Sequence, residues 1–167
     1  MTLVIARAGM EAVAQTDALM HEAANWLVAK GEALWGPNEL SYEELTRVAE
    51  AGELITGRID GALAGCMYLH NEDKLFWPQD EPGQAFYVHR LAVARRYAGQ
   101  GYAHAMLAWA EGETRRQNRP FLRLDCAPRA KLLALYQSVG FVRVDADPIE
   151  VIGHFVVRHE KRLGLPA

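Results

Sequence analysis

The spacing of apolar residues divides this chain into short strands and amphipathic helices. Residues 3–7 form a β-type run and predict a first strand. Asp17 is the expected cap of a first helix, which ends around residues 31–37. One face of this helix is predicted to turn to the interior, and it carries Leu19, Ala23, Trp26, Leu27 and Leu34.

A second, shorter helix is predicted to follow. Ser41 and Glu44 have the spacing of a capping box, which marks a helix N-terminus. Gly52 is the expected stop signal. The apolar stripe between these signals consists of Leu45, Val48 and Ala49.

A hairpin and a long polar stretch come next. Residues 53–58 and 62–70 read as two strands joined by Asp-Gly, a strong hairpin signal. The polar stretch, residues 71–84, is long for a hairpin loop. It permits two interpretations: a cover over a substrate pocket, or a surface excursion pinned by Phe76 and Trp77.

The remaining pattern alternates strands with helices. Residues 85–93 lack clean alternation, which indicates a central strand covered on both faces. A helix over 102–118 and a strand over 121–126 follow. Pro128 is the expected first position of the next helix, and Gly140 is its expected C-terminal stop, with Phe141 packing behind it. The apolar face of this helix is Leu132, Leu135, Tyr136 and Val139.

Residues 142–145 and 151–159 read as two closing antiparallel strands. The order β-α-α-β-β-β-α-β-α-β-β combines a parallel crossover with hairpins. It therefore predicts an α/β (α+β) fold, a mixed sheet with helices on its faces. With 167 residues, half of them apolar, the chain is expected to form a single domain over residues 1–167 with a proper core.

Composition excludes several classes of partner. A net charge of −3 gives no general attraction to nucleic acid or to acidic membranes. No apolar run approaches the ~20 residues that a membrane span needs. Cys66 and Cys126 are far apart, so we expect two buried thiols in a reduced, cytoplasmic setting. The start of the chain reads as a strand and not as a secretory signal. No mutual spacing that suggests a metal site is found among His21, His70, His104, His154 and His159.

The stretch from Arg95 to Ala103, RRYAGQGYA, joins the strand at 85–93 to the helix behind it. Gly99 and Gly101 let the backbone turn sharply and approach a ligand. The first amides of a helix have no carbonyl partners within it, and the helix dipole is positive at that end. The junction is therefore predicted to bind an anion, most often a phosphate.

Two motifs narrow this prediction. GxGxxG and GxxxxGK[ST] are both absent from the junction, but Arg96-x-x-Gly99-x-Gly101 matches R/Q-x-x-G-x-G/A. Downstream, Leu135 to Phe141 matches LYxxxGF. By this pair, which spans residues 86–141, the chain resembles the Gcn5-related N-acetyltransferase (GNAT) superfamily. The resemblance implies a mixed, mostly antiparallel central sheet of about 6–7 strands with about four flanking helices.

The resemblance also implies acetyl-CoA as co-substrate and no metal. The junction amides would bind the pyrophosphate, and the backbone of the preceding strand would pair with the pantetheine arm. Arg95 and Arg96 would add charge-assisted contacts, unless they form an ordinary solvated basic pair. The residues implied in cofactor binding are Leu91, Ala92, Val93, Arg95, Arg96, Ala98, Gly99, Gln100, Gly101, Tyr102 and Ala103.

Tyr136 matches the tyrosine that often serves this family as general acid toward the departing thiolate. The alternative is a core tyrosine on an amphipathic helix. Arg129 stands seven residues earlier, where the family often has an asparagine that binds the cofactor. Because arginine only donates hydrogen bonds, we expect Arg129 to meet a phosphate instead, with Lys131 nearby.

The general base has two candidates. His89 lies two residues before Leu91 on the same predicted strand, so its side chain is expected to point to the same side. Histidine titrates in the useful range and can take a proton directly or through water. Its alternative is a structural, hydrogen-bonded role. Asp125 is the other candidate, and its alternative is to cap the helix near Pro128.

These observations predict an acetyl-CoA-dependent N-acetyltransferase that acts on a primary amine of a small molecule or peptide. Transfer of another acyl group is a close variant. A non-catalytic acyl-CoA-binding or regulatory module would keep the junction without needing an acid or a base. A nucleotide-binding module ranks last, since the acidic ribose partner is missing. A monomer and a homodimer paired through the final strand are both consistent with the sequence.

Overall fold

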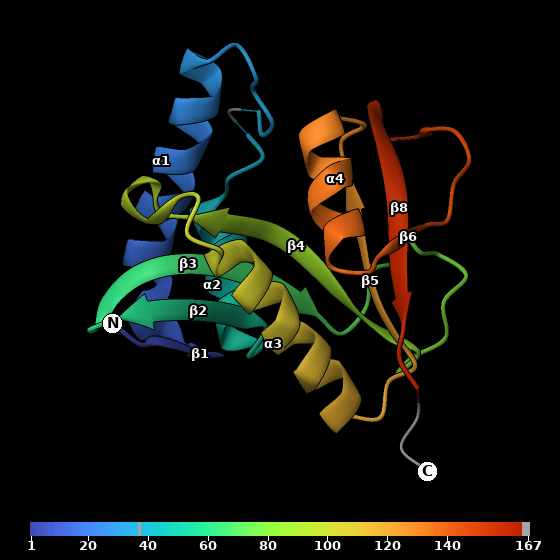
Figure 1. The fold of residues 1–167 in the computed structure, drawn as a ribbon, viewed down its shortest axis with the longest axis horizontal. Helices are drawn as coiled ribbons and strands as arrows, with labels where there is room; N and C mark the ends of the chain where they lie inside the picture. The colour runs from blue at the N-terminus through green and yellow to red at the C-terminus, as the bar shows by residue number, and fades with distance from the viewer. Residues whose placement is uncertain (37, 165–167) are drawn as a thin grey trace. The chain divides into compact units, whose positions relative to one another are not determined.

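The structure is a computed structural model that describes residues 1–36 and 38–164 (Figure 1). In this part of the chain it has four α-helices and an eight-stranded, mostly antiparallel sheet. The α/β (α+β) fold predicted from the sequence is confirmed. The strands are β1 (Leu3–Arg7), β2 (Leu54–Ile59), β3 (Ala62–His70), β4 (Ala85–Val93), β5 (Phe121–Cys126), β6 (Val142–Arg143), β7 (Ile149–Val151) and β8 (His154–Arg162). The helices are α1 (Val13–Ala29), α2 (Tyr42–Glu50), α3 (Tyr102–Arg116) and α4 (Ala130–Ser138), and two short 3-10 helices are η1 (Met10–Ala12) and η2 (Arg95–Tyr97).

The chain forms two compact units. The first unit contains Met1–Tyr68 and Arg90–Met106. The second contains Leu69–His89 and the chain from Leu107 onward. Each unit is therefore built from two separate stretches of sequence, and β3, β4 and α3 each contribute residues to both.

In the first unit, β1, β2 and β3 form an antiparallel meander. β1 pairs with β2 from Leu3 opposite Ile59 to Arg7 opposite Ile55. The β2–β3 hairpin turns at Asp60 and Gly61, whose φ angles of 50° and 82° are both left-handed. This is the conformation that a two-residue hairpin turn requires, and it explains why the Asp-Gly pair predicted the turn correctly.

Helix α1 begins five residues earlier than the sequence predicts. Its N-cap is Ala12, and Asp17 lies inside the helix, where it pairs with His21 at 3.4 Å. Ala12 and Val13 are almost fully buried in the core of this unit. Their burial extends the helix beyond the expected cap, since tertiary packing outweighs a capping preference. The predicted member Leu34 lies past the end of the helix.

Helix α2 forms as predicted. Ser41 is its N-cap and accepts a hydrogen bond from the Glu44 amide at 3.1 Å. Leu45, Val48 and Ala49 are buried in the core of the unit. Gly52 follows the helix with a left-handed φ of 72°.

In the second unit, β5 lies between one parallel and one antiparallel neighbour. Its parallel ladder with β4 runs from Ala85–Phe121 to Val88–Leu124. Its antiparallel ladder with β8 runs from Phe121–Arg162 to Cys126–Val157. The predicted parallel crossover from β4 through a helix to β5 is confirmed.

The C-terminal strands differ from the prediction. Residues 151–159 do not form one strand, because Ile152 and Gly153 have φ angles of 43° and 82° and form a turn between β7 and β8. This division raises the number of strands above the expected 6–7. β8 has β5 on one side and the short strands β6 and β7 on the other. It is therefore not a sheet edge, and pairing of two copies through it is not expected.

Helix α4 starts two residues later than predicted. Its N-cap is Arg129, so Pro128 lies before the helix and not at its first position. The end is as expected: Gly140 has a φ of 90°, and the amides of Phe141 and Gly140 donate to the carbonyls of Tyr136 and Gln137. These two bonds form a Schellman motif, in which Phe141 packs back on the helix.

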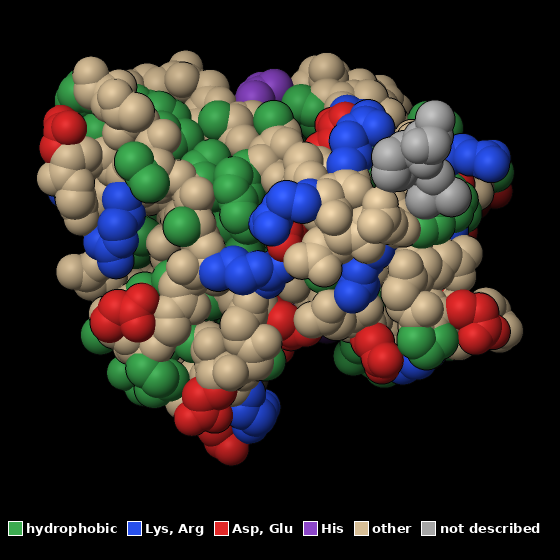
Figure 2. Space-filling view, turned by 90° about the horizontal axis from the view of Figure 1, so that it is seen from below, with side chains coloured by type: hydrophobic (Ala, Val, Ile, Leu, Met, Phe, Trp, Pro, Cys, Tyr) green, Lys and Arg blue, Asp and Glu red, His purple; other side chains and the backbone are tan. Residues whose placement is uncertain are grey.

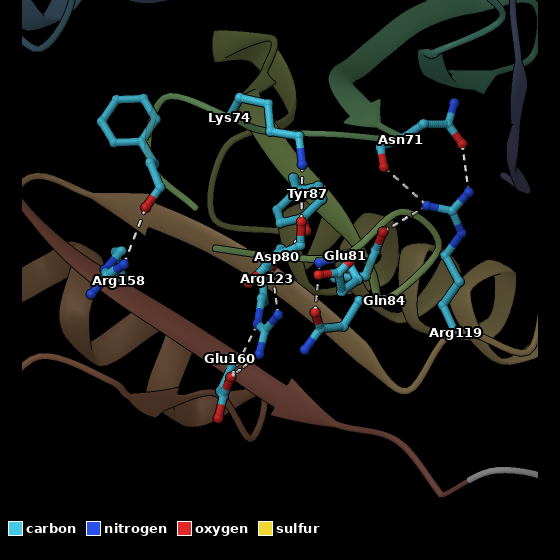
Figure 3. Close-up of polar contacts among 12 residues, drawn as sticks. Asn71, Lys74, Asp80, Glu81, Gln84, Tyr87, Arg119, Arg123, Arg158 and Glu160 are labelled. Atoms are coloured by element: carbon cyan, nitrogen blue, oxygen red, sulfur yellow. Dashed lines mark hydrogen bonds and ion pairs between the residues drawn. The ribbon is translucent and has the colours of Figure 1, made fainter. Parts of the chain in front are cut away.

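The long stretch between β3 and β4 is anchored on the second unit at several points. Trp77 is only 4% exposed and packs with Ala85 and Tyr87. Asp80 accepts hydrogen bonds from Tyr87 and Arg123, each at 2.5 Å (Figure 3). Burial of a tryptophan agrees with the interpretation of a surface excursion pinned by aromatics. A role as cover of a substrate pocket stays a prediction.

Two further arginines hold the same stretch from outside it. Arg119 donates to the carbonyl of Asn71 at 3.1 Å and to its side-chain oxygen at 2.7 Å (Figure 3). Arg158 donates to the carbonyl of Phe76 at 3.2 Å. Contacts at both ends and in the middle fix the path of this loop.

The surface and the cysteines agree with the composition. On the face drawn in Figure 2, basic and acidic side chains are interspersed. Cys66 and Cys126 are both buried and free, as predicted. Within residues 1–36 and 38–164, none of the helices has the length and apolar character that crossing a bilayer requires.

Candidate functional site

The predicted anion site lies in the first unit, where the chain passes from β4 to α3. After β4 the Ala94 amide donates to the Ala64 carbonyl at 2.8 Å, which ties the junction to β3. Gly99 and Gly101 then adopt left-handed φ angles of 74° and 83°. The hydrogen bonds of α3 begin with the Ala105 amide, which donates to the Gly101 carbonyl at 3.1 Å. The amides from Gly99 to Ala103 precede this first helical bond, so they are placed as the prediction requires.

The amide of Ala98 differs from its predicted neighbours. It donates to the Arg95 carbonyl at 3.1 Å and closes the η2 turn. In this structure the Ala98 amide therefore closes the turn, and its predicted contact with the diphosphate stays a prediction.

The two glycines are required for conformation and not for space. A Cβ built on Gly99 or Gly101 would meet nothing within 4 Å. Their positive φ angles, however, are strained for any residue with a Cβ. The glycines therefore keep the turn at low energetic cost.

Gly65 lets α3 pack closely on the sheet of the first unit. A Cβ at Gly65 would lie 2.7 Å from Met106 Sδ and 3.1 Å from the Ala92 carbonyl oxygen. Because backbone cannot give way easily at such distances, β3, β4 and α3 fit together only without a side chain here. This contact helps to fix the start of α3, and sequence reasoning did not single it out.

The side chains of Arg95 and Arg96 rest on neighbours in the first unit. The Arg95 guanidinium lies 3.4 Å from the centre of the Trp26 ring, and its amide donates to Glu22 at 3.1 Å. The Arg96 guanidinium donates to the Leu63 carbonyl at 3.4 Å. The role of both arginines in anion binding stays a prediction.

The strand before the junction contains an irregularity. Arg90 has a φ of 52°, which is unusual for a residue other than glycine and costs about 1–3 kcal/mol. Its guanidinium donates to the Glu39 carbonyl at 2.7 Å and lies 5.7 Å from the Trp35 ring centre, and these contacts hold it in place. The rule that alternate residues share a face assumes an extended backbone and does not apply at Arg90, so the shared side of His89 and Leu91 stays a prediction.

Tyr136 lies in the second unit, on the buried face of α4. It is 9% exposed, and its ring meets Phe141 edge-on at 5.9 Å and His159 at 6.1 Å. Burial is the largest cause that raises the pKa of the Tyr136 phenol, followed by the neighbouring Cys126 and Asp125 side chains. The phenol therefore keeps its proton well into the alkaline range and is available as a donor.

His89 and Asp125, the two candidate bases, lie next to each other in the second unit. His89 Nδ1 is 3.7 Å from Asp125 Oδ1. A third group, Asp73, places Oδ2 at 2.8 Å from His89 Nε2. Asp125 does not cap α4, because the N-cap is Arg129. Sequence reasoning missed Asp73, which lies in the polar stretch and carries no motif.

These three groups are also the candidate metal ligands among the described residues, since their ligand atoms lie within 4.8 Å of one another. A metal ion would take one imidazole nitrogen and draw the carboxylates to that side of the ring. Here each nitrogen of His89 faces a different carboxylate, and the 2.8 Å contact is a hydrogen bond. The arrangement fits a site for protons better than a chelate.

Arg129 is half-buried at the start of α4, where its carbonyl accepts the first helical bond from the Leu133 amide at 3.0 Å. The residue thus stands at a helix N-terminus, a position suited to an anion contact. Its predicted contact with a phosphate remains a prediction.

Comparison with known proteins decides the family. Residues 18–141 match the acetyltransferase (GNAT) family, and this segment contains both motifs. The chain belongs to the GNAT acetyltransferase family. A Bacillus subtilis (strain 168) relative, described as the uncharacterized N-acetyltransferase YesJ, is 30% identical over 136 residues, which are 77% of this chain and 76% of that protein.

Solved GNAT structures share the fold. An acetyltransferase of the GNAT family from Listeria monocytogenes 4b F2365 superimposes with a TM-score of 0.80 at 24% identity, over 96% of this chain and 95% of that one. The PaiA N-acetyltransferase of Thermoplasma acidophilum, solved in complex with coenzyme A, gives a TM-score of 0.75 at 16% identity. That match covers 98% of this chain and 100% of the other. At these identities the similarity establishes the GNAT fold.

The conformational role of the junction glycines makes a stability prediction. Gly101→Ala should lower the free energy of unfolding by about 1–2 kcal/mol, because alanine is strained at a left-handed φ. Gly112→Ala, inside α3 itself, is the matched control. Its φ is not left-handed and its added Cβ meets nothing within 4 Å, so it should stabilise the chain by up to about 1 kcal/mol. Chemical denaturation measures both, and equal effects of the two substitutions would contradict the described turn.

Proposed function

We propose that this GNAT family member is an acetyl-CoA-dependent N-acetyltransferase that transfers an acetyl group directly to a primary amine of a small molecule or peptide. The observation that carries the proposal is the junction of β4 and α3. Its amides from Gly99 to Ala103 precede the first helical bond, behind two left-handed glycines. Amides in this arrangement suit the diphosphate of coenzyme A. The coenzyme A bound to PaiA supports the same ligand class for this chain.

The remaining cofactor contacts follow from the same junction. The backbone of Leu91, Ala92 and Val93 would pair with the amides of the pantetheine arm, and one N–H there would polarise the thioester carbonyl. The left-handed Arg90 supports this role, since it bends the strand just before those residues. Arg95, Arg96 and Arg129 would add charge to phosphate binding.

Tyr136 is the proposed general acid. Acetyl transfer forms a C–N bond and breaks the C–S bond, so negative charge develops on the departing sulfur. The buried phenol of Tyr136 can donate its proton to that sulfur and regain one from the new amide nitrogen. The phenol carries its proton at working pH, as a general acid must.

His89 is the proposed general base. An acceptor amine is an ammonium ion near neutral pH and must lose one proton before it can attack. The imidazole of His89 can take that proton, and the carboxylates of Asp73 and Asp125 beside it would stabilise the charge.

Thermal unfolding with ligands tests the proposed function. Coenzyme A and acetyl-CoA at 100 times their dissociation constants should each add about 2.7 kcal/mol of stability, whereas ATP and NAD should add none. A panel of amines with acetyl-CoA should then release thiol at a rate that depends on the amine. Stabilisation without any amine-dependent thiol release would contradict transfer and favour a binding module. Stabilisation by ATP or NAD alone would contradict the ligand class.

Replacement of the proposed acid gives a further prediction. Tyr136→Phe should lower kcat about 100-fold or more, since proton transfer by a placed acid contributes about that much. The dissociation constant of the variant for acetyl-CoA should change little, because the phenol acts on the sulfur only as the C–S bond breaks. Tyr42→Phe, at a tyrosine 53% exposed on α2, is the matched control and should behave as wild type. Full turnover of Tyr136→Phe would remove the assignment.

A further inference from the structure

The carboxylate of Asp73 is fixed at both oxygens. Its Oδ1 accepts a hydrogen bond from the Phe76 amide at 3.0 Å, and its Oδ2 meets His89 Nε2 at 2.8 Å. The side chain is 7% exposed. Loop contacts from Arg119, Arg158 and Arg123 hold the segment that carries it (Figure 3). Asp73 therefore has one oxygen left for the histidine and no freedom to move away from it.

This contact sets which nitrogen of His89 carries the proton. An ionised carboxylate only accepts hydrogen bonds, so Nε2 must carry a hydrogen to meet Asp73 at 2.8 Å. Burial opposes the charge of Asp73, but the hydrogen bond from His89, the charge of that ring and the Phe76 amide together lower the pKa of Asp73. The carboxylate is thus ionised at neutral pH, and the lone pair of a neutral His89 lies on Nδ1.

The lone pair on Nδ1 faces a second acceptor. Asp125 Oδ1 lies 3.7 Å away, and the Asp125 side chain is 11% exposed. Two acceptors that face each other at this distance repel until a proton lies on one of them. His89 and Asp125 therefore form a pair that holds one proton more readily than either group would alone.

We propose that Asp73 is a positioning residue that fixes the tautomer of His89, and that His89 Nδ1 and Asp125 together accept the proton lost by the acceptor ammonium. This inference rests on the proposed N-acetyltransferase function. The ammonium gives one proton to the pair, its nitrogen forms the C–N bond, and the C–S bond breaks. A second N–H proton ends on the coenzyme A thiol, and the first leaves the pair for solvent. The two candidate bases are thus parts of one site.

Other groups around the ring complete its surroundings. His70, at the end of β3, lies 5.3 Å from the His89 ring centre, and the Phe76 ring lies at 5.9 Å. Arg158 is the β8 partner of Asp125, but its guanidinium is held by Asp145 at 2.8 Å. Beyond Asp125 are Cys126 and Tyr136. Burial, and then the charge of Asp125, raises the pKa of the Cys126 thiol to about 12, so this thiol stays neutral.

Asp73→Asn tests the positioning role. The asparagine oxygen can still accept the hydrogen bond from the Phe76 amide, and the asparagine NH₂ group then donates to His89 Nε2. The ring must carry its own proton on Nδ1, which removes the lone pair that faces Asp125. In ligand-free protein above the titration midpoint of the ring, ¹⁵N spectra of the imidazole should show Nε2–H in wild type and Nδ1–H in the variant. The variant should lose about 100-fold or more in kcat/KM for the amine, with the affinity for acetyl-CoA unchanged.

Asp125→Asn tests the shared proton without moving the tautomer. It removes the negative charge that stabilises a proton on Nδ1, so the ring should titrate at a pH about one unit lower. The acidic limb of the kcat/KM profile should move to lower pH by the same amount, because the base works only when it is deprotonated. Asp60→Asn, at the exposed hairpin turn where asparagine tolerates a left-handed φ, is the matched control and should change none of these quantities.

Several results would overturn the inference. The first is a wild-type His89 ring that carries its proton on Nδ1, and the second is an Asp73→Asn variant that keeps the wild-type tautomer. The third is a kcat/KM pH profile that Asp125→Asn does not shift. The fourth is a loss of activity when EDTA removes metal ions. If wild type acetylates no amine at all, the proposed function fails first, and the inference fails with it. The ring spectra then still report whether Asp73 sets the tautomer, so the two failures are distinguishable.

Discussion

The predicted anion site depends on a small set of backbone amides at the start of α3. These amides have no carbonyl partners within the helix. Gly99 and Gly101 hold the chain in left-handed conformations just before them, and Gly65 lets the sheet and α3 come close enough to fix that end. A bond from Ala94 to the β3 backbone completes the support. Unpartnered amides and the positive end of a helix dipole favour an anion. The central functional property therefore belongs to the backbone, and the side chains act mainly to hold it in place.

The sequence predicted those features that depend on local backbone chemistry. Asp60-Gly61, Ser41 with Glu44, and Gly140 with Phe141 each formed the turn or cap that their residue types favour. Features decided by tertiary packing were harder to predict. Burial of Ala12 and Val13 moved the start of α1, and the left-handed Arg90 disturbed the alternation on which the placement of His89 relied.

The residues of the candidate site divide in the same way, into those marked by a local motif and those brought together only by the fold. The junction glycines and Tyr136 were accessible because their motifs are contiguous in sequence. Asp73 was not, because it reaches His89 across 16 positions from a stretch without regular structure, and only the fold brings the two together. The split of the C-terminal strand at Ile152 and Gly153 was missed for a simpler reason, since the glycine lay within an apolar run that looked continuous.

In the second unit, the proposed acid and the proposed base are linked electrostatically. The charge of Asp125 is one cause of the raised pKa of Tyr136. A proton taken up by the His89–Asp125 pair would reduce that negative charge. The phenol would then become a stronger acid once the amine has been deprotonated, when the departing sulfur needs a proton. One carboxylate would thus serve both proton transfers and set their order.

A crystal structure of the complex with coenzyme A tests the central claim most directly. The account predicts diphosphate oxygens within about 3.2 Å of the amides between Gly99 and Ala103, at the N-terminus of α3. A diphosphate bound by side chains elsewhere, with those amides facing solvent, would contradict it.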